Sequence, residues 1–124
     1  MTTERNLYIL DVAVIVDPQL SSADRHLGES MIHLALPEAP WSRSSGAALD
    51  TEEGGNTSIL KAHCIRVTDA GDEISEAALT AKCCEIGLRL SALGVPGMRA
   101  VRFKIHIILI HSSTQSQDHT SPAS

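Results

Sequence analysis

Residues 71–112 constrain the fold most, because they combine a helix, a tight turn and a strand in direct succession. One side of the expected helix is apolar, with residues recurring at helical spacing: Leu79, Cys83, Ile86, Leu90 and Leu93. Gly94 is suited to the left-handed residue that ends a helix, and Pro96 prevents its continuation. The pattern predicts a long amphipathic helix over about 73–93.

The strand predicted after this turn, from Arg99 to His111, changes character along its length. Its first half alternates between apolar residues and cationic ones, the latter being Arg102, Lys104 and His106. From Ile107 to Ile110 both faces are apolar, which is typical of a strand segment that is buried on both faces. One helix covers only one face of a small sheet, so we expect something else to cover the second face.

Two further strands are predicted, over 7–17 and 58–69. The first is apolar on both faces apart from Asp11, so it should be central in the sheet or buried at an interface. The strand–helix–strand order of 58–111 predicts a parallel crossover if both strands share one sheet. Residues 1–6 precede the first strand and are expected to be frayed.

Residues 21–36 fit two structures. Ser22 could cap a helix, whereas Ser30 to Leu36 alternates like a strand, and Gly28 favours a break between them. We favour the strand. If the segment were helical, the order would approach a split β-α-β arrangement of ferredoxin-like type, with its second strand drawn from the residues before Ser58.

The predicted fold class is α+β. We expect a small three- to four-stranded aliphatic sheet with one long helix packed on one face. Residues 1–112 should form a single domain. The segment 37–57, which is rich in Pro, Gly, Ser and acidic residues, is predicted to be a long mobile loop, and 113–124 a disordered tail.

Composition excludes several classes of function. The chain of 124 residues has a formal charge of −5 and only 2% aromatic residues, which disfavours nucleic-acid binding by base stacking. No apolar run approaches the roughly 20 residues needed to span a bilayer. Three cysteines without framework spacing argue against a disulfide scaffold. These features predict a soluble, cytoplasmic protein.

The ionisable residues give three weak candidates for catalysis: Asp11, His63 and His106. Asp11 is the lone charge in an apolar strand, so it could serve as a base beside either histidine, or simply face solvent or pair with Arg102 or Lys104. The pairs His63-Cys64 and Cys83-Cys84 are adjacent rather than spaced to chelate, so we expect no metal site and no cofactor. Whether the protein is an enzyme is left open.

The excess of apolar strand faces over helices favours association. The first hypothesis is a non-enzymatic interaction or assembly protein that forms a homodimer or larger oligomer through its sheet. The residues expected at that interface are Val12, Val14, Ile107, Ile108 and Ile110. The 37–57 loop or the tail would be available to a protein partner. The alternative is an apolar-ligand-binding protein or an isomerase or cyclase, with a cleft between sheet and helix lined by Asp11.

Overall fold

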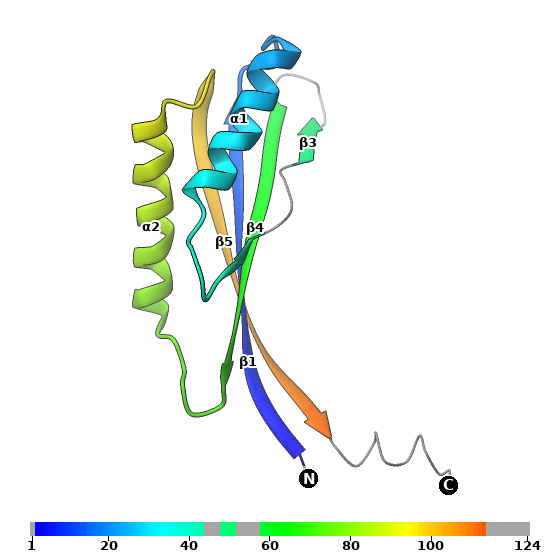
Figure 1. Ribbon diagram of the computed structural model, residues 1–124, viewed down its shortest axis with the longest axis vertical. Helices are drawn as coiled ribbons and strands as arrows, with labels where there is room; N and C mark the ends of the chain where they lie inside the picture. The colour runs from blue at the N-terminus through cyan, green and yellow to red at the C-terminus, as the bar shows by residue number, and fades with distance from the viewer. Residues whose placement is uncertain (1, 44–47, 52–57, 114–124) are drawn as a thin grey trace, which may run out of the picture.

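The computed structural model describes residues 2–43, 48–51 and 58–113, and within them it is an α+β fold (Figure 1). The elements in chain order are β1 (Thr2–Val16), α1 (Ser22–Ala35), β2 (Ser42–Arg43), β3 (Ala48–Thr51), β4 (Ser58–Asp69), α2 (Glu76–Leu93) and β5 (Met98–Ser113). The α+β class and the strand over 58–69 are therefore confirmed. Within the predicted 37–57 loop, residues 37–43 and 48–51 are described, and they include two short strands. Residues 44–47 and 52–57 of that loop, and residues 114–124 of the tail, lie outside the described residues.

The strands form one antiparallel sheet in the order β2-β4-β1-β5, and β3 also pairs with β4. Because β1 runs antiparallel to both β4 and β5, those two strands are parallel to each other on either side of it. Helix α2 connects them, which is the predicted parallel crossover. With α1 after β1, and with β2 and β3 beside β4, the connectivity is the split β-α-β arrangement of ferredoxin-like type.

The segment 21–36 is a helix, so the strand favoured above is wrong, and so is the expectation of a single helix. Ser21 caps it by accepting a hydrogen bond from the backbone N–H of Asp24 at 3.1 Å. Gly28 does not break the helix, because it allows close approach to the sheet. A β-carbon there would lie 3.1 Å from Cδ1 of Leu60 on β4. The glycine that argued against a helix is thus a packing residue.

Helix α2 matches its prediction, except that it begins at Glu76 instead of about 73. The difference arises because Ser75 is the N-cap, accepting a hydrogen bond from the backbone N–H of Ala78 at 3.1 Å. At the other end Gly94 has φ +72°, which is the predicted left-handed cap.

Strand β1 begins at Thr2, so residues 2–6 are not frayed as expected. They are ordered because they pair with the C-terminal end of β5, from Leu109 to Ser113. Pairing with β4 starts only at Arg5. The ends of β1 and β5 consequently form a two-stranded ribbon that extends beyond both helices (Figure 1).

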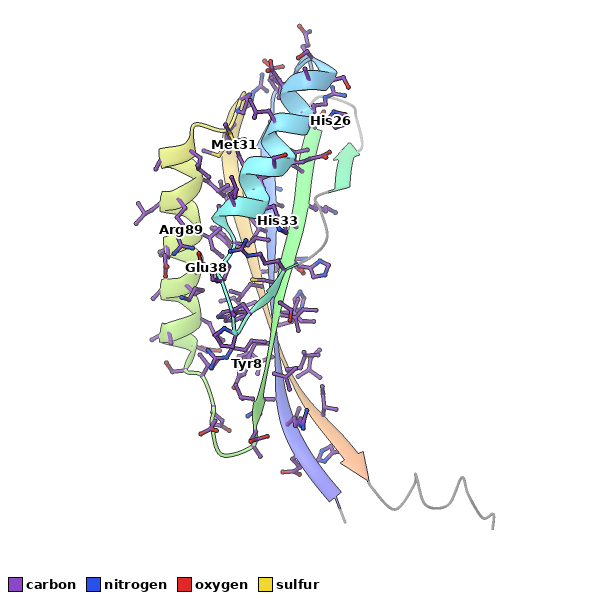
Figure 2. The ribbon with its side chains drawn as sticks, viewed as in Figure 1. Tyr8, His26, Met31, His33, Glu38 and Arg89 are labelled. Carbon is purple, nitrogen blue, oxygen red and sulfur yellow. The ribbon has the colours of Figure 1, made fainter. Side chains whose placement is uncertain are left out.

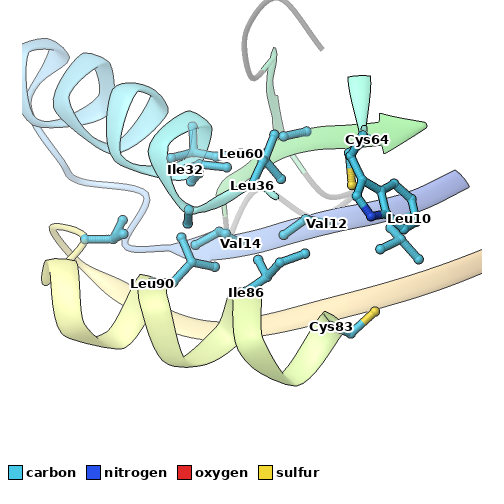
Figure 3. Packing of buried hydrophobic residues seen from close by; sticks show 14 of the residues in the cluster. Leu10, Val12, Val14, Ile32, Leu36, Leu60, Cys64, Cys83, Ile86 and Leu90 are labelled. Atoms are coloured by element: carbon cyan, nitrogen blue, oxygen red, sulfur yellow. The ribbon is translucent and has the colours of Figure 1, made fainter. Parts of the chain in front are cut away.

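The core lies between the helices and one face of the sheet (Figure 3). Alternate residues of β1 point into it: Tyr8, Leu10, Val12, Val14 and Val16. They meet Ile32 of α1 and Ile86 and Leu90 of α2, so both helices cover the same face. Val12 and Val14, which were expected at an interface, are thus covered by the chain's own helices. A partner cannot reach them while the fold is intact.

Candidate functional site

The face of the sheet opposite the helices carries the candidate catalytic residues. Strand register places side chains in rows across β4, β1 and β5. Three successive rows are Lys61, Ala13 and Arg102; His63, Asp11 and Lys104; and Ile65, Ile9 and His106. We call these nine residues the central rows. They belong to segments far apart in the sequence, and only the sheet brings them together.

Asp11 lies at the middle of the central rows. Its Oδ2 atom is 2.7 Å from Nε2 of His106, and the two side chains are 45% and 44% exposed. His63 lies directly opposite Asp11 on β4. A contact of this exposure contributes about 1 kcal/mol or less to stability, so its main effect is to orient the imidazole. The structure therefore places all three candidate residues on one face.

The position of Asp11 differs from the predicted cleft. Asp11 is on the uncovered face, whereas the space between sheet and helices around β1 is filled by the buried core. The reason is the alternation of the strand: the even-numbered residues of β1 point toward the helices, so odd-numbered ones point away. Any site built on Asp11 lies on the open side of the sheet.

A shallow depression of about 500 Å³ lies over the central rows. Its charged and imidazole side chains are Asp11, Lys61, His63, Arg102 and Lys104. Ala13 lies between Lys61 and Arg102 in the register, and its single methyl group leaves a hollow between two long side chains. Arg102 and Lys104 were predicted to share a strand face, whereas Lys61 was not predicted to join them, because only the pairing of β1 with β4 brings it alongside.

A second depression, of about 300 Å³, lies on the helix side between α2 and the residues after α1. Glu38, Arg66, Lys82 and Arg89 contribute to its lining, and Figure 2 shows Glu38 and Arg89 on the same side of the molecule. Lys82 and Arg89 both bind Glu85, at 3.2 and 2.7 Å. The positive charge there is largely matched by neighbouring carboxylates.

The cysteines do not form a reactive centre. Cys64 and Cys83 are buried and Cys84 is exposed. Burial raises the pKa of the Cys64 thiol to about 12, and burial also raises the pKa of Cys83. Both thiols stay protonated near neutral pH and are poor nucleophiles. Among the described residues, no group of three or more His, Cys, Asp or Glu side chains is arranged to hold a metal ion.

Alkylation tests this assignment. Iodoacetamide at a pH of about 8 is expected to modify Cys84 and to leave Cys64 and Cys83 intact, because Cys84 is exposed whereas the other two thiols are buried and have raised pKa values. Peptide mass spectrometry before and after denaturation in urea measures the difference. Modification of Cys64 in the folded protein as fast as that of Cys84 would contradict the burial described above.

The second exposed feature is apolar and lies on β5, at the edge of the sheet. Ile107, Ile108 and Leu109 are consecutive and are 48%, 44% and 52% exposed, and Ile110 is partly buried. We call Ile107 to Ile110 the β5 apolar segment. Val67 of β4 is also exposed. It lies in the same row as Ile108, because both residues pair with Leu7 of β1, from opposite sides. Val67 was not among the residues predicted at an interface.

Fold and surface thus define a small α+β protein with a ferredoxin-like sheet, an open cationic face and an apolar edge strand. No family model matches the chain, and the comparison with curated proteins also finds no match. Among the described residues, neither helix has the length and apolar character needed to cross a membrane.

Proposed function

We propose that this protein is a non-enzymatic assembly protein that forms a homodimer through the edge of its sheet. The observation that supports this function is the β5 apolar segment, with three consecutive large side chains about half exposed on an edge strand. Burying a large apolar side chain completely stabilises by roughly 1.5–3 kcal/mol, so half-exposed ones would each add about 1 kcal/mol on association.

The β5 apolar segment lacks the features that normally prevent strand pairing, whereas the first half of β5 carries Arg102 and Lys104. Natural edge strands are blocked by inward charges, proline or bulges. Within the β5 apolar segment there is no proline and no charged residue, and the irregularity in the register of β1 with β5 lies elsewhere, at Ile15 and Val16. In the described part of the chain β5 has a strand neighbour on one side only. Its outer backbone groups are therefore suited to a second strand.

The proposed occupant is β5 of a second copy, running antiparallel about a two-fold axis near Ile108. In this register Ile107 meets Leu109 of the other copy, and the two apolar segments cover each other. His106 then lies opposite Ile110, and Lys104 opposite position 112. In this register none of these cations faces another cation, so the pairing places no like charges opposite each other.

The test is the mass in solution of the wild type and two lysine variants. Sedimentation velocity at about 100 µM is expected to give twice the chain mass for the wild type. Leu109→Lys should give a monomer, because a lysine in the paired edge would be desolvated. Leu88→Lys is the matched control, since Leu88 is 72% exposed and belongs to α2 instead of β5.

Circular dichroism must show that both variants retain the secondary structure of the wild type. The proposal is wrong if the wild type is a monomer at this concentration, or if Leu109→Lys and Leu88→Lys dissociate equally.

A second candidate function is the binding or isomerisation of a small ligand. The 2.7 Å contact of Asp11 with His106 favours it, because a carboxylate that orients an imidazole is an arrangement used by general bases. Such a site would use the open face of the sheet. An Asp11→Asn variant that folds normally and keeps every ligand interaction of the wild type would count against it.

A further inference from the structure

We propose that the depression over the central rows is a binding site for a small organic oxyanion, of the phosphate or carboxylate class. This inference does not require the dimer, because the depression lies on the face of the sheet and the β5 apolar segment lies farther along the edge, although Lys104 belongs to both the depression and the pairing stretch of β5. Three observations support this site: the charge of the face, the shape of the depression and the contact that Asp11 makes with His106.

The charge is opposite to that of the chain as a whole. The formal charge of the protein is −5, but the described lining of the depression includes Lys61, Arg102 and Lys104, and Asp11 is the carboxylate among those described residues. Arg102 and Lys104 are two residues apart on one strand and therefore share a face. Like charges gathered on one sheet face repel one another, and an anion bound among them would reduce that repulsion.

The shape suits a ligand of modest size. The hollow over Ala13 lies between Lys61 and Arg102, and Lys104 stands at its side in the next row. A guanidinium presents a planar fork that matches two oxygens of a phosphate or carboxylate, and an ammonium adds a point charge. About 500 Å³ accommodates a small organic molecule that carries such a group.

Other contacts of these side chains do not conflict with a ligand. Lys61, His63 and Arg102 already take part in interactions within the chain. An ammonium and a guanidinium carry three and five donors, so each can keep such a contact while donating to an oxyanion. The contact of Asp11 with His106 also matters, because a carboxylate engaged by an imidazole repels a nearby anion less.

The experiment is a titration of the full chain with sodium pyrophosphate and, separately, with sodium citrate, followed by two-dimensional NMR at about 0.15 M salt. We expect saturable shifts with a Kd of about 1 mM or below. The shifts should be confined to residues of the central rows. Saturation by pyrophosphate alone indicates a phosphate site, by citrate alone a carboxylate site, and by both a general oxyanion site.

Two double variants separate a built site from net charge. Arg102→Gln with Lys104→Gln should weaken binding by at least about tenfold, because two charge-assisted contacts are lost. Lys82→Gln with Arg89→Gln removes the same charge from α2 and should leave the Kd within about twofold, the residual effect of salt-screened net charge. The proposal is wrong if neither anion shows saturable binding. It is also wrong if the two double variants weaken anion binding equally.

Discussion

Replacing Val14 with lysine is expected to leave the protein unfolded. Val14 is 0% exposed in the core beneath both helices, although its strand looks apolar on two faces in the sequence. An ammonium there would have no partner, and burying it would cost more than about 4 kcal/mol, most of the stability of a small domain. Circular dichroism and one-dimensional NMR of the variant measure the loss of structure.

The matched control is Ile108→Lys. Ile108 was expected at the same interface as Val14, but it is exposed on β5, so the lysine should leave the fold intact. Under the proposed function it should also prevent the dimer from forming. A folded Val14→Lys protein that is merely monomeric would show that β1 is an interface after all, and would contradict the core assignment.

Truncating Leu90 to alanine is expected to lower the free energy of unfolding by about 3 kcal/mol. The side chain is 0% exposed on α2, and its loss combines the transfer free energy of the removed atoms with a cavity that the core cannot close. Urea denaturation followed by circular dichroism at 222 nm, a helix signal, measures the change.

Leu88→Ala serves as its control, because it makes the same substitution two residues away on the exposed side of the same helix. Its effect should stay within about 0.5 kcal/mol. Equal losses in the two variants would mean that α2 does not present the Leu90 side of the helix to the sheet.

The two proposed sites use different properties of one sheet. Association at the β5 apolar segment would bury side chains and backbone groups along an edge, and salt should affect it little. Anion binding at the central rows would depend on Lys61, Arg102 and Lys104, and it should weaken as ionic strength rises. Salt dependence therefore distinguishes the two kinds of binding in the same preparation.

Some of this structure follows from local sequence alone. Helix α2, its left-handed cap at Gly94 and strand β4 were predicted nearly to their ends. Their signals lie within a few residues: the apolar stripe at helical spacing, the glycine before Pro96 and the β-rich composition of 58–69. Which residues of β1 share a face was also predictable, since alternation is a local property of a strand.

Distant parts of the chain decided the rest. The local sequence of 21–36 is compatible with either a helix or a strand. The helix forms because it packs on β4, where Gly28 lies against Leu60. Asp11 and His106 are 95 residues apart, and only the antiparallel register of β1 and β5 places them in contact. The sequence by itself determined which strand faces are apolar. The tertiary structure decided which face the helices cover, because both are tied to the same side of the sheet by the crossovers that follow β1 and β4.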